Sequence, residues 1–406
     1  MANVSSSNGL EKRPKLRFPG FDEPWNTALL SDYFVKSTKK NSDGMISNVI
    51  CNSAKQGLIP QREYFDKDIA NSDNTNGYYI IESNDFVYNP RKSADAPYGP
   101  ISSYQYPEAG IVSPLYLCFR AKREINPLYF EWYFRSSTWH RYIYMSGDSG
   151  ARHDRVSIKD DVFFAMPINV PSAKEQERIT LFLDAIERRI ETQRTLVETL
   201  KKYKRGLLNK LFSNINSNIY PTVYLSEVAD FLQGLTYSPS DVSVSGYLVL
   251  RSSNIQNGML SFDDCVYVDK KVDESLQVKC DDVIMCVRNG SKNLVGKTAL
   301  IPPNMPMTTW GAFMMIIRSK LNDTYIFHYL NSQMFFSQVF KDAGTATINQ
   351  ITKGILNECK LPLPPETERK QISKMLSSFD AKIQNAEKCL ATLVNLKKAL
   401  LQQLFI

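Results

Sequence analysis

Residues 171–212 read PSAKEQERITLFLDAIERRIETQRTLVETLKKYKRGLLNKLF, and residues 364–405 read PPETERKQISKMLSSFDAKIQNAEKCLATLVNLKKALLQQLF. The two stretches align without a gap at a constant offset of 193 residues. Ile179 matches Ile372, Leu183 matches Leu376, and GLLNKLF matches ALLQQLF. Because an internal repeat dictates the architecture, we expect two globular halves, each followed by a copy of one long helix.

Core positions in both copies recur at spacings of four and three, and all are large apolar residues except Gln193, Lys204, Ala386 and Lys397. The large apolar residues are Ile179, Leu183, Ile186, Ile190, Val197, Leu200, Leu207 and Leu211 in the first copy, and Ile372, Leu376, Phe379, Ile383, Leu390, Leu393, Leu400 and Leu404 in the second. This is the a/d pattern of a coiled coil, sustained over more than four heptads. Ser172 and Glu175 have capping-box spacing, and Pro365 suits a first helical turn. Each helix of about 40 residues would be roughly 60 Å long.

The charges on the two seams predict the direction of pairing. A parallel, in-register pair would place Lys204 against Lys397, whereas an antiparallel pair separates them. Ile179 would then face Leu404, Ile190 would face Leu393, and Leu211 would face Ile372. We therefore predict an antiparallel coiled coil with Lys204 near Asp380 and Lys397 near Glu187.

The end of each helix has a wider apolar face than a two-stranded seam requires. Leu208, Phe212, Leu401 and Phe405 are apolar but lie off the a and d positions. They are either packed onto the protein's own globular domains or available to a partner subunit.

Composition places the chain among ordinary globular proteins. It has 406 residues, 43% of them hydrophobic and 22% charged, a length that favours two or three domains. The polar first twenty residues do not resemble a secretory leader, and no apolar run approaches a membrane span. The seven cysteines form no CxxC motif, which is typical of reduced thiols in a cytoplasmic protein. A formal net charge of +7 permits a polyanionic partner without requiring one.

The repeat extends more weakly into the globular halves. Residues 85–89 (DFVYN) parallel 282–286 (DVIMC), 115–122 (LYLCFRAK) parallel 313–320 (FMMIIRSK), and 128–143 parallel 324–339. These pairs predict short buried strands and an amphipathic helix in each half, with turns rich in Gly, Asn and Pro between them. The expected fold class is α+β, with two mixed domains in a pseudo-two-fold arrangement joined by two long antiparallel helices. A shared frame with different loops is the layout of one scaffold presenting two binding surfaces.

No motif in the sequence predicts catalysis. Residues 290–298 (GSKNLVGKT) resemble a P-loop, but five residues rather than four separate the glycines, and prolines follow too soon for a helix. We expect a turn between strands there. His140, His153 and His328 have no partner at metal spacing, and no methyltransferase or nuclease motif is present. The sequence therefore predicts a binding protein rather than an enzyme, and it predicts no metal site.

Loop residues able to contact DNA are well represented. Arg and Lys pair with guanine and phosphate, and Asn and Gln pair with adenine, so loops rich in these residues suit base reading. The candidates in the first half are Lys55, Gln56, Arg91, Lys92, Tyr98, Ser103, Tyr104, Gln105, Arg152 and Arg155. Those in the second half are Arg251, Asn254, Gln256, Asn257, Arg288, Ser291, Lys292, Asn293, Asn349 and Gln350.

These features together resemble the specificity (S) subunits of type I restriction-modification systems. The resemblance rests on the two long helices with their start and end motifs, on residues 16–21 (LRFPGF) leading to Trp25, and on residues 110–114 (GIVSP). It covers nearly the whole chain. The implied domains are a polar tail (1–15), target-recognition domain 1 (16–170), spacer helix 1 (171–212), a linker (213–219), target-recognition domain 2 (220–363) and spacer helix 2 (364–406).

The resemblance implies a non-catalytic DNA-binding subunit. Each recognition domain would read one half of a split, asymmetric double-stranded DNA target, and the coiled coil would fix the gap between the halves. Two methyltransferase (modification) subunits would dock on the helices, around Leu208, Phe212, Leu401 and Phe405, and methylate adenines. The methyltransferase subunits would bring S-adenosylmethionine. A motor-nuclease (restriction) subunit would join the complex, and ATP too would be bound by a partner subunit. The location would be cytoplasmic, without membrane contact.

Two alternatives remain open at this point. One is the recognition subunit of a related, type II-like system whose single partner both methylates and cuts. The other is a coiled-coil scaffold with two protein-binding heads and no DNA.

Overall fold

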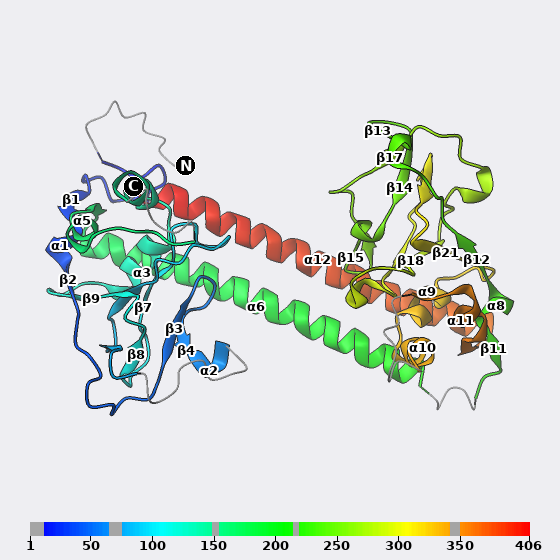
Figure 1. Ribbon diagram of the computed structural model, residues 1–406, viewed down its shortest axis with the longest axis horizontal. Coiled ribbons are helices and arrows are strands. Elements are labelled where there is room, and N and C mark those ends of the chain that lie inside the picture. Colours follow the sequence, from blue (N-terminus) through cyan, green and yellow to red (C-terminus); the bar gives the residue numbers. More distant parts are fainter. Residues whose placement is uncertain (1–11, 65–74, 148–153, 214–218, 342–349) are drawn as a thin grey trace. The chain divides into compact units, whose positions relative to one another are not determined.

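The computed structural model describes residues 12–64, 75–147, 154–213, 219–341 and 350–406 (Figure 1). The chain divides into two compact units, and each is described by itself. Unit 1 comprises Met1–Gln193 and Cys389–Ile406, and unit 2 comprises Arg194–Lys388. Each unit therefore contains one globular half and a stretch of both long helices.

The globular part of unit 1 alternates short strands and short helices. Its elements are β1 (Asn26–Leu29), α1 (Leu30–Tyr33), β2 (Phe34–Lys36), β3 (Ile50–Ser53), β4 (Gly57–Pro60), α2 (Gln61–Tyr64), β5 (Tyr79–Ile81), β6 (Phe86–Tyr88), β7 (Ile101–Ser103), β8 (Gly110–Val112), β9 (Leu117–Ala121), α3 (Pro127–Arg135), α4 (His140–Ser146), α5 (Asp160–Phe164) and β10 (Pro167–Val170).

The globular part of unit 2 has more strands and several 3-10 turns. Its elements are β11 (Thr222–Tyr224), α8 (Leu225–Val228), β12 (Ala229–Gln233), η2 (Pro239–Asp241), β13 (Val242–Ser243), β14 (Tyr247–Leu250), η3 (Ser252–Asn254), β15 (Ile255–Gln256), β16 (Met259–Leu260), β17 (Tyr267–Val268), η4 (Glu274–Leu276), β18 (Val283–Cys286), η5 (Lys292–Leu294), β19 (Thr298–Leu300), β20 (Thr308–Trp310), β21 (Met314–Ser319), α9 (Tyr325–Leu330), α10 (Gln333–Val339), α11 (Lys353–Glu358) and β22 (Lys360–Pro362).

Both units contain the same antiparallel four-stranded sheet. Its strand order is β2-β9-β6-β7 in unit 1 and β12-β21-β18-β19 in unit 2. A two-stranded sheet, β1-β10 or β11-β22, leads into the long helix in each case. The remaining sheets differ, because unit 1 has the pairs β3-β4 and β5-β8 where unit 2 has β15-β16 and the mixed sheet β13-β17-β14-β20. The expected α+β class and the repeated frame are thus confirmed.

An Arg–Asp pair with a buried aspartate recurs at the same place in both sheets. Arg120 holds Asp85 through two hydrogen bonds, Nε to Oδ1 at 2.6 Å and Nη2 to Oδ2 at 2.7 Å. Arg318 holds Asp282 through the same two bonds, at 2.8 and 2.7 Å. Each aspartate also accepts a backbone N–H three residues upstream, from Glu82 or Lys279. These bidentate contacts fix the start of β6 and β18 against the neighbouring strand.

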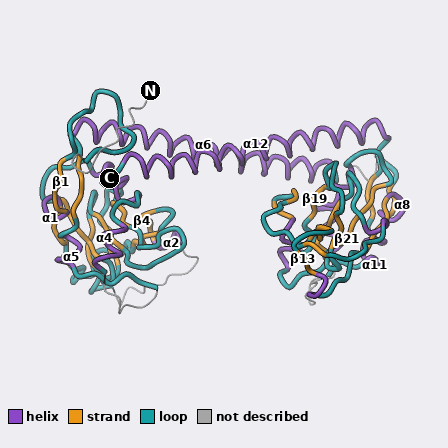
Figure 2. Tube along the Cα trace, turned by 90° about the horizontal axis from the view of Figure 1, so that it is seen from above, coloured by secondary structure: helices purple, strands orange, loops and turns teal. Residues whose placement is uncertain are grey.

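The long helices are α6 (Ala173–Leu211) and α12 (Glu366–Leu404), drawn green and red in Figure 1. α6 begins two residues after Pro171, α12 begins directly after Pro365, and both helices are uninterrupted. Within unit 2 the strands gather on one side of the helix pair (Figure 2).

Pairing of the two helices is antiparallel within each unit, as predicted. In unit 1, Lys397 Nζ lies 2.7 Å from Glu187 Oε2. In unit 2, Lys204 Nζ contacts Asp380 Oδ1. Ile179 and Leu404 are buried in the same core cluster of unit 1. The prediction of pairing from the two seam lysines is confirmed.

The apolar ends of the helices pack on the protein's own domains. Phe212 is 2% exposed, and its ring lies 5.1 Å from that of Tyr325 on α9. Phe405 is also 2% exposed and lies 5.7 Å from Tyr129 on α3. Leu208 and Leu401 are buried in the same two clusters. The expectation that these four residues bind a partner is therefore wrong, because full burial of such side chains, worth about 1.5–3 kcal/mol each, already secures the domain to its helix.

Candidate nucleic-acid interface

The loop after β18 carries the candidate residues of unit 2. Arg288 forms an isolated antiparallel bridge with Gln350, and Ile351 N donates to Val287 O at 2.7 Å. The Arg288 guanidinium lies over the Phe313 ring, 5.3 Å from its centroid. The backbone is thus pinned while Arg288, Ser291, Asn293 and Gln350 remain exposed. The segment 290–298 is a turn between β18 and β19, as expected.

A hydrogen bond joins this loop to the turn that follows β14. Asn289 Nδ2 donates to Ser252 Oγ at 3.1 Å. Arg251 precedes that turn and pairs with Asp264 at 2.8 Å, so its guanidinium is oriented but partly neutralised. Gln256 and Asn257 are exposed beyond the turn.

Asn254 is not available for base reading. It is 0% exposed, its Oδ1 accepts Arg251 N–H, and its Nδ2 donates to the carbonyls of Ser261 and Asp264. The expectation for this residue is wrong, because its amide is used to close the turn. Sequence reasoning could not distinguish a capping asparagine from an exposed one.

The loop after β6 is the equivalent feature of unit 1. Arg91 forms an isolated antiparallel bridge with Arg155. Lys92 N donates to Asp154 O at 2.8 Å, and Val156 N donates to Pro90 O at 2.9 Å. Arg91 and Lys92 are exposed on this pinned strand pair. Because β6 and β18 are equivalent strands, the predicted clusters around Arg91 and Arg288 occupy the same place in the repeated frame.

The turn between β3 and β4 adds two residues to the unit 1 cluster. Lys55 Nζ lies 3.5 Å from Asp95 Oδ2, which places the turn beside the loop after β6. Gln56 is exposed.

Of three other unit 1 candidates, two are buried and one packs against the core. Tyr104 is 0% exposed, and its hydroxyl donates to Glu108 O at 2.9 Å. Ser103 is 5% exposed, and its N–H donates to Glu131. Tyr98 is half-buried with its ring 4.8 Å from that of His140. The expectations for Ser103 and Tyr104 as DNA contacts are wrong, since Ser103 is a buried residue of β7 and Tyr104 is buried in a core cluster with Ile50, Leu58 and Val112. Gln105 is exposed.

Some candidates lie outside the described part of the chain. They are Arg152, Asn349 and the side chain of Lys292.

Sequence reasoning missed one pair of exposed residues at the edge of the interface. Phe313, 57% exposed, precedes β21, and Leu115, 59% exposed, takes the equivalent place before β9. Both begin the paired stretches LYLCFRAK and FMMIIRSK. A large apolar residue opening a strand in both halves was the available signal.

The chemistry of both clusters is that of a surface for phosphates and base edges. Arginine, lysine and glutamine side chains project from loops whose backbones are fixed by the sheet, which is the arrangement that direct readout requires. Among the described residues no group of three or more His, Cys, Asp or Glu could hold a metal ion. Within that same part of the chain, no helix is both long and apolar enough to cross a membrane.

Comparison with known sequences identifies the second half directly. Residues 220–394 match the family model described as "Type I restriction modification DNA specificity domain". The E. coli K12 type I restriction enzyme EcoKI specificity subunit is 28% identical over 171 residues, 40% of this chain and 36% of that protein. The Salmonella potsdam StySPI specificity subunit is 28% identical over 176 residues, 41% of this chain and 38% of that protein. The matched region thus spans less than two fifths of these relatives.

A wider match is found with an archaeal relative. The Methanocaldococcus jannaschii MjaVIII specificity subunit is 24% identical over 241 residues, 54% of this chain and 56% of that protein.

Two solved structures share the fold over almost the whole chain. One, from work on "complex assembly" and "conformational transition of the type I R-M system", has a TM-score of 0.61 at 17% identity and covers 95% of this chain and 98% of its own. The other, a type I restriction-modification S subunit from M. genitalium, has a TM-score of 0.56 at 14% identity, with 97% and 99% covered. At such identities the likeness supports the fold alone. The chain is therefore similar to the specificity subunits of type I restriction-modification systems, because residues 220–394 match their DNA specificity domain and the first half repeats the same frame.

Proposed function

We propose that this protein is the DNA-recognition subunit of a type I restriction-modification complex. Each globular half reads one half of a split, asymmetric target in double-stranded DNA. The observation that carries the proposal is the specificity-domain match at residues 220–394, combined with a first half that repeats its sheet and its pinned arginine loop. The loop residues differ between the halves, so the two half-sites differ in sequence.

The proposed recognition domains are residues 16–170 and 220–363, with residues 1–15 as a tail and 213–219 as a linker. Base reading is assigned to the exposed residues of the two clusters. The exposed ones are Lys55, Gln56, Arg91, Lys92 and Gln105 in the first half, and Gln256, Asn257, Arg288, Ser291, Asn293 and Gln350 in the second. The half-buried Arg155 and Arg251 are assigned with them. Arginine contacts to guanine and phosphate supply affinity that falls steeply with salt.

The long helices, residues 171–212 and 364–406, act as the spacer. Each of α6 and α12 has 39 residues, so each is about 58 Å long at 1.5 Å per residue. That length exceeds one turn of DNA, about 34 Å. A rigid helix pair therefore suits a target whose halves are separated by a fixed number of unread base pairs.

Two methyltransferase subunits dock on the helices and bring S-adenosylmethionine and the catalytic groups, and a motor-nuclease subunit that uses ATP completes the restriction complex. Since Leu208, Phe212, Leu401 and Phe405 are buried, docking falls on other helix positions. Leu196 and Tyr203 on α6 are 46% and 58% exposed and lie one heptad apart. At an offset of 193, α12 presents the exposed Cys389 and Leu396. We name these pairs patch A (Leu196, Tyr203) and patch B (Cys389, Leu396).

The equivalence of patches A and B supports two copies of one partner, because repeated positions offer the same surface twice. Because its proposed partners and DNA target are in the cytoplasm, this protein is proposed to be cytoplasmic.

Co-expression with the neighbouring methyltransferase gene, followed by methylome sequencing, tests this function. The expected result is co-purification and adenine methylation at one bipartite motif, lost without this chain. Methylation that persists without the chain, or a motif with a single undivided site, would contradict the proposal. A partner that both methylates and cuts would indicate the related two-subunit system.

A further inference from the structure

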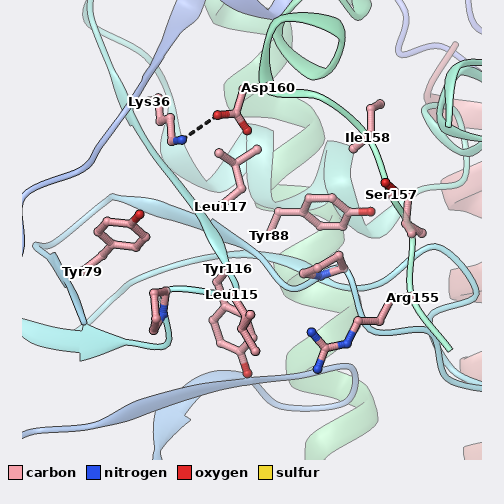
Figure 3. A pocket seen from close by; sticks show the side chains of 13 residues that line it. Lys36, Tyr79, Tyr88, Leu115, Tyr116, Leu117, Arg155, Ser157, Ile158 and Asp160 are labelled. Carbon is pink, nitrogen blue, oxygen red and sulfur yellow. Dashed lines mark hydrogen bonds and ion pairs between the residues drawn. The ribbon is translucent and has the colours of Figure 1, made fainter. Parts of the chain in front are cut away.

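A cavity of about 410 Å³ lies in unit 1, beside the pinned loop after β6 (Figure 3). It is bounded by the end of β6, by residues 114–117 before and within β9, and by residues 155–158. Its volume is in the range of cavities that hold a small organic ligand, about 300–1,000 Å³. Because Arg155 lines it, the cavity is continuous with the proposed DNA-reading loop.

Aromatic rings form much of the cavity wall. Tyr79, Tyr88 and Tyr116 line it together with Pro90 and Leu117. The Tyr88 hydroxyl donates to Tyr98 O at 2.8 Å, so this ring is held in place. Burial raises the pKa of both Tyr88 and Tyr116, which keeps their hydroxyls protonated at neutral pH. Tyr88 is 2% exposed and stacked on Phe163, so it supports the wall from behind, and the half-buried rings of Tyr79 and Tyr116 are the ones that favour a flat, aromatic ligand.

The charge in the cavity is unbalanced. Arg155 Nε is buried and has no hydrogen-bond partner among the described residues. The carboxylate at the opposite end, Asp160, is already paired with Lys36 at 2.5 Å (Figure 3). A buried guanidinium nitrogen without an acceptor is costly, so the site is complementary to an anion that supplies one.

Unit 2 lacks this combination at the equivalent positions. Tyr88 corresponds to Met285, and Tyr116 corresponds to Met314, because the β6-β9 and β18-β21 registers match. Arg155 corresponds to Gln350 through the two isolated bridges. The aromatic wall and the unpaired cation are therefore particular to unit 1, whereas the shared sheet needs neither.

We propose that this cavity binds a single nucleotide, with the base against the tyrosine wall and the phosphate at Arg155. A planar base and an attached phosphate are the chemistry that the wall and the guanidinium recognise together. The nucleotide is either extruded from the bound DNA, in which case the site rests on the proposed function, or a free mononucleotide.

The first arm of the test uses free ligands. Binding of each of the four deoxynucleoside monophosphates to the full chain is measured by saturation-transfer NMR and titration. Arg155→Gln, which installs the residue of unit 2, should weaken binding at least tenfold. Leu115→Trp, at the exposed rim, should also weaken it by narrowing the mouth. Lys122→Gln, which removes an exposed charge elsewhere in unit 1, is the matched control and should change nothing.

The second arm uses DNA. After the target has been read by methylome sequencing, 2-aminopurine is placed at each position of both half-sites in turn. Extrusion predicts a rise in emission at one position of one half-site, lost in Arg155→Gln and retained in Lys122→Gln.

The outcomes separate the two sources of the nucleotide. Free-nucleotide binding that depends on Arg155 supports a free ligand, and an Arg155-dependent emission change supports extrusion. Sequence-specific DNA binding with neither signal overturns the cavity proposal while leaving the proposed function intact. Failure to bind DNA at all contradicts the proposed function, and the free-ligand arm then decides the cavity alone.

Discussion

The indole Nε1 of Trp132 donates a 2.7 Å hydrogen bond to Oδ1 of Asp184, which joins α3 to α6 in unit 1. The same positions of the repeat in unit 2 hold His328 and Ser377, whose Nε2 and Oγ lie 3.3 Å apart. Both units thus have a side-chain contact between the globular domain and the long helix at this position, but unit 1 uses an indole and a carboxylate and unit 2 an imidazole and a hydroxyl. An indole does not titrate near neutral pH but an imidazole does, so the two units should respond differently to acid.

Acid should destabilise unit 2 through His328. Burial and the nearby Lys204 ammonium lower its pKa to about 3, whereas an unfolded histidine has a pKa of about 6.5. The unfolded state therefore binds more protons between these values, and stability falls as pH drops below 6.5. Between pH 7 and 5 the loss should be about 2 kcal/mol. Urea unfolding at both pH values, with hydrogen exchange of α9 reporting unit 2, measures it.

His328→Gln, which keeps a hydrogen-bonding group, should remove that part of the pH dependence. Burial also lowers the pKa of His140 in unit 1, so His140→Gln is the matched control and should leave the pH dependence of hydrogen exchange in α9 unchanged. If the free energy of unfolding of His328→Gln still falls by the same amount between pH 7 and 5, other groups cause the loss.

Removing one partner of the repeated Arg–Asp pair should destabilise the protein more than replacing both partners by apolar residues. Asp282 is 2% exposed on its side chain and Arg318 22%. Asp282→Asn leaves a partly buried guanidinium without its counter-charge and should cost about 3 kcal/mol in the free energy of unfolding. The double variant Asp282→Leu with Arg318→Met should cost less than the single one. Denaturant titration of the set, with Asp85→Asn as the unit 1 counterpart, measures this. A double variant less stable than Asp282→Asn would show that the pair contributes net stability.

Arginine substitutions should relax one half-site at a time. Arg288→Ala should reduce discrimination in the half-site read by unit 2 by about 1–3 kcal/mol and leave the other unchanged. Arg91→Ala should do the reverse. Binding to duplexes with one randomised half-site gives the preference at each position. Asn254→Ala is the control, because loss of this buried turn residue should lower the melting temperature without altering base preference. Equal relaxation of both half-sites by Arg288→Ala would exclude the assignment.

Introducing charged residues into either patch A or patch B should cause the complex to lose one methyltransferase subunit. Leu196→Glu with Tyr203→Glu buries carboxylates in an apolar contact, so stoichiometry should fall from two partners to one. Cys389→Glu with Leu396→Glu should have the same effect. Native mass spectrometry of the co-expressed complex counts the subunits, and Asn209→Glu, elsewhere on α6, is the control. Retention of both partners in both double variants would place docking on other residues.

Shortening both helices together should shorten the spacer of the target. Removal of residues 191–197 and 386–392 takes one heptad from each helix and keeps the antiparallel register. The loss is about 10 Å, equivalent to about three base pairs at 3.4 Å each. Methylome sequencing of cells carrying the deletion reads the new spacer. A motif with its original spacer would refute the role of the helices as a ruler.

The sequence alone determined the frame, because the features that fix it are periodic or repeated. Heptad spacing predicted both long helices, and the placing of Lys204 and Lys397 predicted their antiparallel pairing, which the ion pairs to Asp380 and Glu187 confirm. The paired stretches before each helix likewise marked the equivalent strands of the two sheets. Local pattern sufficed here because a helix seam and a strand repeat are encoded by nearby residues.

Tertiary structure alone decided which polar and apolar side chains are free. Asn254 and Tyr104 are residue types that contact DNA, yet the first closes a turn and the second is buried in a core cluster with Ile50, Leu58 and Val112. Phe212 and Phe405 look like a docking surface in sequence and are covered by α9 and α3. Burial depends on residues distant in the chain, which is why no single segment discloses it. The unpaired Arg155 inside a tyrosine-lined cavity emerges only when β6, β9 and residues 155–158 come together.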